Sequence, residues 1–242
     1  MEKITRLNPL LEVLRSSPER VDKLLIQEGL KKPKIDEICR EAKKYDLSVS
    51  FMPKKRLDRL DRHHQGAIAF VTSKGYTTID SMLDSSKVPF LVLLDGIEDP
   101  QNLGSIIRTA ECAGVDGIIF PERRAVGLTA AVASVSAGAS EHVRIARVKN
   151  IARTMEELRK RDIWLVGAEG GRSNLWHEFD YTLPVGLIFS SEGKGIRPLV
   201  REKCDRILSI PLLGNITSLN VGAAAAIFLY EVVRQRMKAS NE

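Results

Sequence analysis

The amino-acid sequence predicts an α/β protein with a small N-terminal domain (1–76), a linker (77–88) and a larger C-terminal domain (89–242) built on a mostly parallel sheet. Two observations carry this prediction. Short apolar runs alternate with amphipathic helical stretches along the chain, which is typical of strands connected through helices. In the larger domain, runs such as PFLVLLDG are apolar at nearly every position, as in strands buried on both faces of a sheet.

The first domain alternates helices and strands. A helix is predicted with Asn8 as its N-cap and Pro9 at its first position, because Asn and Pro favour these places. It continues through LLEVLRSS. After it come the strand VDKLLIQEG, the helix PKIDEICREAKKYD, the strand SVSFMP, the basic helix KKRLDRLDR and the strand GAIAFVT. The stretch GYTTIDSMLDSSKV is small and polar, and it therefore predicts the linker.

The second domain has a stronger alternation. The predicted strands are PFLVLLDG, VDGIIFP, HVRIARV, IWLVGAE, VGLIFS and RILSIPL. The predicted helices are NLGSIIRTAECAG, which Gly114 closes, then LTAAVASVSAG, IARTMEELRKR and the C-terminal VGAAAAIFLYEVVRQRMK. Strands in such alternation with helices favour a parallel sheet that is covered on both faces.

The positive charge is unevenly distributed. The chain carries a net charge of +6, and residues 1–76 hold 17 Lys and Arg against 11 Asp and Glu. The remaining 20 basic and 20 acidic residues balance. A basic module joined to a neutral one suggests that the first binds a polyanion while the second carries out chemistry. A solvated basic surface with no partner is the alternative that charge alone leaves open.

Several classes of protein are disfavoured. No apolar run approaches the roughly 20 residues of a membrane span, and the N-terminus MEKITRLNPLLEV lacks the apolar core of a secretion signal. Cys39, Cys112 and Cys204 are widely spaced and form no C-x-x-C pattern, which favours a reducing compartment and disfavours a metal site. We therefore expect a cytoplasmic protein with no membrane or metal partner.

Three loops place small and polar residues at the ends of apolar strands, where open α/β sheets bind ligands. They are DGIEDPQNLGSIIRTA, FSSEGKGIRPLV and IPLLGNITSLNVGAAAA. Each is also compatible with a purely structural role: a helix cap with a surface Arg, a surface turn, and ordinary N-capping by Ser218 or Asn220. Asn102 and Arg108 are six residues apart and would diverge on an unbroken helix. We therefore expect the first loop to fold back if both serve one site.

Together, the three loops resemble the motifs of a known family. N-x-G-x-x-x-R-x-A, S-E-G-x-G and I-P-x-x-G-x-x-x-S-L-N-V are similar to motifs one, two and three of the SpoU (TrmH-like) RNA 2′-O-ribose methyltransferases of the SPOUT superfamily. The resemblance runs from about Phe90 to Arg236. Residues 1–76 more loosely resemble the ribosomal-protein-L30e-like RNA-binding domain of the branch that methylates a guanosine ribose in 23S ribosomal RNA.

This resemblance implies a C-terminal trefoil knot, a homodimer and S-adenosylmethionine as cofactor. The C-terminal helix itself, with Ile227, Leu229 and Val233, offers more apolar surface than one sheet face needs, and together with the resemblance this predicts the homodimer. Cofactor contacts would fall on Ser190, Gly193, Ile210, Leu212 and Leu219. The polar active-site positions would be Arg108, Asn102, Glu192, Ser218 and Asn220, with Arg108 as the residue that activates or grips the reacting group.

Two other functions remain possible from the sequence. A transfer-RNA 2′-O-methyltransferase would carry the same three motifs, although the basic N-terminal domain favours ribosomal RNA. A non-catalytic RNA-binding ribosome-assembly factor could retain the fold without the reaction. The intact polar positions Asn102, Arg108, Glu192 and Asn220 favour an enzyme over this second alternative.

Overall fold

A computed structural model of the chain describes residues 1–170, 174–191 and 195–240. The chain divides into two compact units, which are described separately. The first unit combines residues 1–75 with 127–142, and the second combines 76–126 with 143–242. The segment 127–142 belongs by sequence position to the larger domain, yet it clusters with the N-terminal unit.

The first unit is a small α/β fold around a four-stranded mixed sheet of order β1-β4-β2-β3. Strands β2 and β3 are parallel, whereas β4 pairs antiparallel with both β1 and β2. In chain order the elements are β1 (Glu2–Ile4), α1 (Leu7–Ser16), a 3-10 turn (Pro18–Arg20), β2 (Val21–Gln27), α2 (Pro33–Lys44), β3 (Val49–Met52), α3 (Lys54–Leu60) and β4 (Ala67–Val71), followed by α6 (Ala130–Val135) and a 3-10 turn (Ala139–Glu141).

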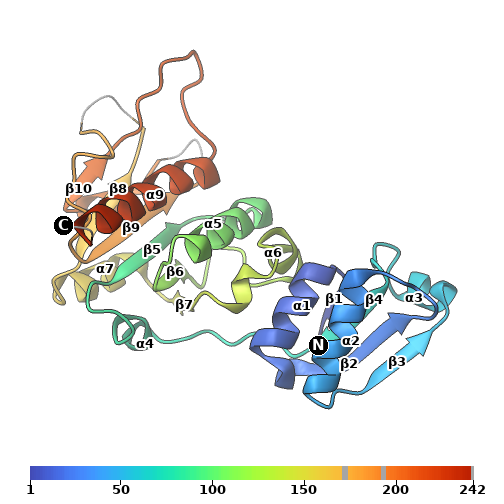
Figure 1. The fold of residues 1–242 in the computed structure, drawn as a ribbon. Helices are drawn as coiled ribbons and strands as arrows, with labels where there is room; N and C mark the ends of the chain where they lie inside the picture. The colour runs from blue at the N-terminus through green and yellow to red at the C-terminus, as the bar shows by residue number, and fades with distance from the viewer. Residues whose placement is uncertain (171–173, 192–194, 241–242) are drawn as a thin grey trace. The chain divides into compact units, whose positions relative to one another are not determined.

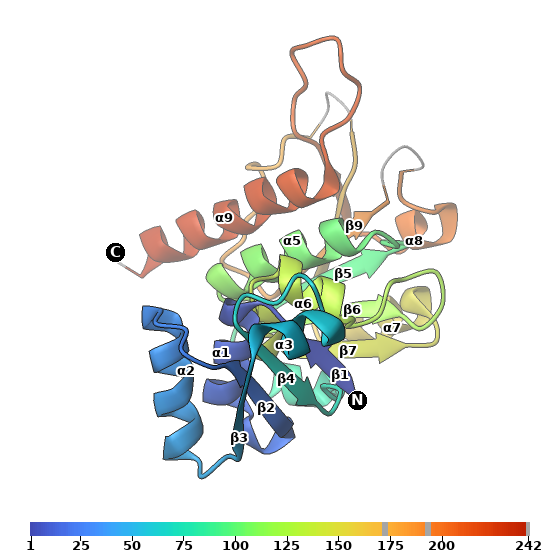
Figure 2. The same ribbon diagram turned by 90° about the vertical axis from the view of Figure 1, so that its right-hand side faces the viewer.

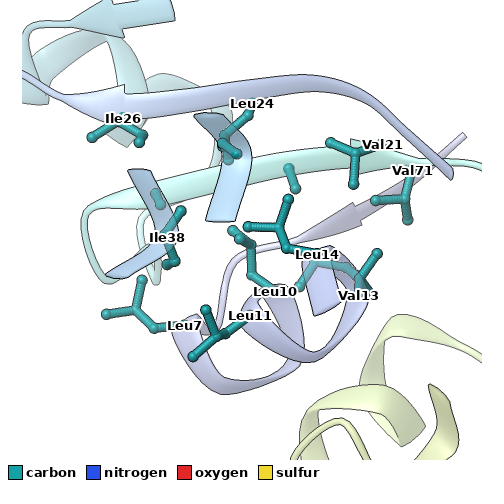
Figure 3. Close-up of a cluster of buried hydrophobic side chains, with 14 of the residues drawn as sticks. Leu7, Leu10, Leu11, Val13, Leu14, Val21, Leu24, Ile26, Ile38 and Val71 are labelled. Atoms are coloured by element: carbon teal, nitrogen blue, oxygen red, sulfur yellow. The ribbon is translucent and has the colours of Figure 1, made fainter. Parts of the chain in front are cut away.

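Apolar side chains of α1 and α2 form the core of this unit against the sheet. Leu10 and Leu14, one helical turn apart on α1, are fully buried, as are Leu24 and Ile26 on one face of β2. Figure 3 shows these side chains together with Ile38 of α2. Three consecutive residues of β2, Leu24, Leu25 and Ile26, are buried, and the buried residues of α1 have helical spacing.

The N-terminal helix begins earlier than the sequence predicts. Its first residue is Leu7, with Arg6 as the flanking residue, and Asn8 lies inside the first turn. The backbone N–H of Leu7 donates to Oε1 of Gln65 at 3.1 Å, a side chain 58 positions away in sequence. A tertiary contact thus satisfies one of the free N–H groups, so the prediction of Asn8 as the cap is wrong. Strand β1 was also not predicted.

An ion pair and several hydrogen bonds hold the segment 127–142 within the first unit. Arg20 pairs with Glu141, and both side chains are largely buried. Nζ of Lys74 donates to the backbone oxygen of Glu141 at 2.8 Å, and burial lowers the pKa of this lysine. Nε2 of His142 lies 2.8 Å from Oε2 of Glu12. These contacts explain why residues distant in sequence form one unit.

The second unit is built on a six-stranded sheet of order β10-β8-β9-β5-β6-β7 (Figure 1). All of its pairings are parallel, which confirms the predicted parallel sheet. In chain order the elements are α4 (Ile79–Leu83), β5 (Phe90–Asp95), α5 (Pro100–Cys112), β6 (Gly117–Pro121), β7 (Ile145–Val148), α7 (Ile151–Arg159), β8 (Trp164–Ala168), β9 (Val185–Ser190), α8 (Pro198–Glu202), β10 (Arg206–Leu208) and α9 (Val221–Ala239).

Helices cover both faces of this sheet. Leu93 and Ile188 belong to a core cluster with residues of α4, α7 and α8. The next residue of β9, Phe189, points to the opposite face, where its ring meets that of Phe228 of α9 at 5.9 Å. Helices α5 and α9 lie side by side there (Figures 1 and 2). A Cβ on Gly222 of α9 would lie 3.0 Å from Oγ of Ser105, so glycine permits this close packing.

Two short helices of the second unit were not predicted. Helix α4 lies within the predicted linker, where Thr78 caps it by accepting from the N–H of Ser81 at 3.3 Å. Its Met82 is fully buried and packs against Gly117 of β6. Helix α8 follows the second motif. The apolar residues of α4, Ile79, Met82 and Leu83, have helical spacing, but they stand in a short stretch that is otherwise small and polar and that was predicted as linker. The trefoil knot stays a prediction.

No helix within the described ranges is long and apolar enough to cross a membrane.

Candidate active site

A cavity of about 280 Å³ opens at the carboxyl ends of the central strands. Asp95 and Ser190, the last residues of β5 and β9, lie opposite each other in register, and Ala168 ends the neighbouring β8. This edge is where open parallel sheets bind ligands. The cavity is lined by Ala168, Glu169, Gly170, Phe189, Ser190, Ser191, Gly195, Ile210, Leu212, Thr217, Ser218, Leu219, Val221, Ala224 and Phe228.

The cavity has an apolar wall and a polar rim. Phe189 and Phe228 are buried side chains from β9 and α9, and Ile210 and Leu212 come from the loop after β10. That loop projects from the sheet before the chain enters α9 (Figure 2). Such a combination of apolar walls with few polar groups is typical of small-molecule sites, which are commonly roughly 300–1,000 Å³ in volume.

The third motif meets the first through two asparagines. Asn220 caps α9, its Oδ1 accepting from the N–H groups of Gly222 at 2.9 Å and Ala223 at 3.3 Å. Its Nδ2 donates to Oδ1 of Asn102 at 2.8 Å. Because capping fixes the orientation of the Asn220 amide, its NH₂ group is held toward α5. Two residues 118 positions apart are thereby fixed beside the cavity.

Arg108 does not join this pair. Helix α5 starts at Pro100 and continues unbroken to Cys112, so the expected fold-back of the loop does not occur. Six residues of α-helix separate Asn102 from Arg108, which corresponds to roughly 9 Å along the axis and about 120° around it. Arg108 is exposed, and its side chain makes no hydrogen bond or ion pair with another residue in the described part of the chain. Its guanidinium is available to a ligand outside the chain.

An ion pair between a half-exposed arginine and a buried aspartate connects the first motif loop to the second. The side chain of Asp95 is fully buried at the end of β5, and Arg197 forms a two-pronged contact with it. Nε of Arg197 donates to Oδ2 of Asp95 at 2.7 Å. This hydrogen bond raises the pKa of Arg197. Since Arg197 flanks α8, the pair anchors the chain just after the second motif to the central strand.

The predicted cofactor positions fall largely around the cavity. Ser190, Ile210, Leu212 and Leu219 line it, and so does Ser218, which we assigned to the active-site set. Glu192 and Gly193 lie outside the described residues, so their predicted roles stay predictions.

Three further cavity residues were not singled out from the sequence. Phe189 and Phe228 each occupy a core position of a predicted element, so nothing distinguished them from other buried aromatics. Glu169 follows the strand IWLVGA directly, at the end where ligands bind. Its position after a strand was a usable signal, although it belongs to none of the three motifs.

Metal binding finds no support in the described part of the chain. Among those residues, no group of three or more His, Cys, Asp and Glu side chains could hold a metal ion. The cysteines Cys39, Cys112 and Cys204 are unpaired thiols. Burial raises the pKa of the Cys204 thiol to about 12, with the nearby Asp205 and Glu169 carboxylates contributing.

Comparison with known families identifies the family of the chain. Residues 89–230 match the SpoU rRNA methylase family, more than half of the chain. The chain belongs to the SpoU rRNA methylase family. Residues 7–77 match a second family, described as RNA 2′-O ribose methyltransferase substrate binding. Residues 89–230 therefore contain the cavity edge, the Asn102–Asn220 pair and all three motifs. The basic helix α3 lies in the segment that matches the substrate-binding family.

Relatives in this family match the chain over most of their own length. YacO of Bacillus subtilis (strain 168), assigned to the TrmH family of tRNA/rRNA methyltransferases, is 41% identical over 234 residues, covering 95% of this chain and 94% of YacO. The crystal structure of the SpoU methyltransferase AviRb from Streptomyces viridochromogenes, in complex with its cofactor AdoMet, aligns with a TM-score of 0.82 at 26% identity. That alignment covers 98% of this chain and 90% of AviRb.

A transfer-RNA enzyme aligns over less of the chain. The TrmH/SpoU tRNA-modifying enzyme of A. aeolicus aligns with a TM-score of 0.58 at 25% identity. That alignment covers 77% of this chain and 85% of the A. aeolicus chain.

Proposed function

We propose that this RNA methyltransferase transfers a methyl group from S-adenosylmethionine to the ribose 2′-hydroxyl of a nucleotide, a guanosine, in 23S ribosomal RNA. The observation that carries the reaction is the apolar cavity at the strand ends with the Asn102–Asn220 pair beside it. Family membership supports RNA methylation, and the substrate-binding family match over residues 7–77 supports a ribose 2′-hydroxyl as the acceptor.

The cavity suits S-adenosylmethionine. Phe189 and Phe228 offer an apolar wall for a flat heterocycle, and Ser190, Thr217 and Ser218 offer polar groups at the rim. The volume of about 280 Å³ is near the lower end of the usual range for such ligands. The AdoMet complex of AviRb, which has the same fold, supports this choice of cofactor.

The chemistry needs few protein groups. S-adenosylmethionine supplies a methyl group that its sulfonium has already activated, so the protein must align the hydroxyl and assist loss of its proton. The fixed amides of Asn102 and Asn220 can hold the ribose at the cavity. Arginine carries a fixed positive charge in proteins, so Arg108 grips the neighbouring phosphate and polarises the hydroxyl, whose proton leaves to phosphate or water. Glu192 orients the ribose or Arg108.

Helix α3 supplies the strongest candidate surface for RNA. It exposes Lys54, Lys55, Arg56 and Arg59, while Leu57 on its opposite face is fully buried. Phe51, on the strand just before it, is 58% exposed. Cations beside an exposed aromatic ring suit a polyanion whose bases can stack.

Ribosomal RNA is favoured over the alternatives. The family matched over residues 89–230 is described as an rRNA methylase family, whereas the transfer-RNA enzyme of A. aeolicus aligns over 77% of the chain. A non-catalytic assembly factor would not need the paired amides beside a cofactor-sized cavity. A ribosomal RNA substrate, together with free thiols, supports a cytoplasmic location.

The substrate is tested by mapping 2′-O-methylation. Ribosomal and transfer RNA from cells with and without the gene are compared by a method that detects 2′-O-methyl groups at single nucleotides. We expect one guanosine of 23S ribosomal RNA to lose its methyl group and to regain it when the gene is restored. Loss of a transfer-RNA site would instead support the transfer-RNA alternative, and no change at any site would favour the assembly factor.

We also propose a homodimer that forms through α9. Leu229, named for this role from the sequence, is fully buried inside its own unit. The exposed apolar positions along one side of the helix are Ala223, Ile227, Tyr230 and Met237, and the exposed Arg234 lies on the same side. Tyr230 is 50% exposed and lies near the middle of this stripe.

Tyr230→Glu is expected to convert the dimer to a monomer at micromolar concentration. A buried carboxylate facing its copy would lack a partner, and this costs several kcal/mol. Light scattering measures the mass, with Tyr230→Phe as the matched control that keeps the ring. A monomeric wild-type protein with full activity would refute the dimer, and a dimeric Tyr230→Glu would place the interface elsewhere.

A further inference from the structure

Glu169 is an acidic residue at the cavity that no motif accounts for. It follows β8 directly, and its backbone N–H donates to the oxygen of Leu208 at 3.0 Å, which fixes the chain at the strand end. Among the described residues that line the cavity, it is the acidic one. Its side chain is largely covered, with 25% exposed.

Two neighbours hold the carboxylate in place. Oε2 of Glu169 accepts from Nε of Arg201 at 2.8 Å. Oε1 lies 2.9 Å from the point where a Cβ on Gly195 would stand. Gly195 also has a φ of +64°, which favours glycine. The chain after the second motif therefore leaves room for this carboxylate at the cavity rim.

The sheet order indicates which part of a ligand Glu169 would meet. Strand β8 lies on the far side of β9 from β5, and α5, with Asn102, follows β5. The methyl group that is transferred must lie near the RNA ribose, hence toward Asn102 and Asn220. Phe189, on β9 between these two strands, belongs to the apolar wall that suits the adenine ring, so the nucleoside half of the cofactor extends toward β8.

We infer that the carboxylate of Glu169 binds the ribose diol of the S-adenosylmethionine nucleoside, with Arg201 as the positioning residue. This rests on the proposed cofactor. An ionised carboxylate offers about four lone-pair sites, so one bond from Arg201 leaves capacity for two hydroxyl donors. Pairing with Arg201 offsets much of the negative charge, so the ligand meets a hydrogen-bond acceptor rather than a net charge. A carboxylate that accepts from ribose hydroxyls is a common device in nucleotide sites.

The test pairs a change in the protein with a change in the ligand. Calorimetry measures the binding of S-adenosylhomocysteine and of its 2′-deoxyribose analogue to the full-length wild type, Glu169→Ala and Glu169→Gln. We expect the wild type to bind the deoxy analogue about 10- to 100-fold more weakly, as for loss of one charge-assisted hydrogen bond. Glu169→Ala should bind S-adenosylhomocysteine about as weakly as the wild type binds the deoxy analogue. It should no longer distinguish the two ligands.

Matched variants separate binding of the diol from a purely structural role of Glu169. Arg201→Ala keeps the carboxylate and should retain discrimination, with a loss of only a few-fold. Equal wild-type and Glu169→Ala affinities would reduce Glu169 to a surface ion pair and overturn the inference. Weaker binding by Glu169→Ala with unchanged discrimination would assign it to another part of the ligand, which also overturns the inference. If the wild type binds neither ligand, the proposed cofactor itself fails.

Discussion

Arg108→Ala is expected to reduce the rate of methyl transfer at least 100-fold while it leaves cofactor affinity nearly unchanged. Arg108 is exposed on α5, about 120° around the helix from Asn102, and it does not line the cavity. Its contribution is therefore to the RNA and not to the cofactor. Removal of one preorganised charge that acts in the transition state costs roughly 3 kcal/mol. Single-turnover methylation at saturating protein and cofactor measures the loss.

Two variants control this experiment. Arg108→Lys should restore little activity, because a point charge does not reproduce the planar fork that holds phosphate and hydroxyl together. Arg153→Ala removes another exposed helical arginine of the same unit, whose contact is an exposed pair with Glu157, and it should stay within a few-fold of wild type. A near wild-type rate for Arg108→Ala would remove this residue from the mechanism.

Neutralising helix α3 is expected to weaken RNA binding at least 100-fold at moderate salt. The variant replaces Lys54, Lys55, Arg56 and Arg59 with alanine, which keeps helix propensity, and leaves the buried Leu57 in place. Each lost phosphate contact lowers the slope of log affinity against log salt by about 0.7–0.9. Four contacts would therefore lower the slope by roughly 3. Affinity measured across a series of salt concentrations gives both quantities.

The matched control removes the same charge elsewhere. A quadruple alanine variant of Lys149, Arg153, Lys160 and Arg161 changes exposed positions of the second unit. It should keep most of the affinity and the salt slope, and both variants should bind S-adenosylmethionine as the wild type does. Equal RNA affinity and equal slope for the two variants would show that α3 is not the docking surface.

Local pattern was sufficient for the strands other than β1 and for the motifs. The apolar run that became β5 is buried along its whole length, and its burial on both faces is what the run predicted. The N-terminal core likewise follows the helical spacing of Leu10 and Leu14. Such features depend on the periodicity of neighbouring residues, which a sequence displays directly.

Ends and short helices were harder to predict. Asn8 has the right chemistry for a cap. However, the helix begins at Leu7, whose backbone N–H donates to the side chain of Gln65, a residue 58 positions away in sequence. Helix α4 has apolar residues at helical spacing, but it is only five residues long and depends on Met82 packing against Gly117. In both places a tertiary contact outweighs a local preference.

The sequence by itself determined the α/β class, the three motif loops and the basic character of the N-terminal third. Tertiary structure alone decided that Asn102 meets Asn220, that Arg108 diverges from both on an unbroken helix, and that Glu169 reaches the cavity rim. It also decided that 127–142 clusters with the N-terminal unit. The physical reason is the sequence separation of the interacting residues. The periodicity of neighbouring residues indicates which side of one helix or strand is buried. Hydrogen bonds between distant residues depend on strand order and helix packing, which periodicity does not contain.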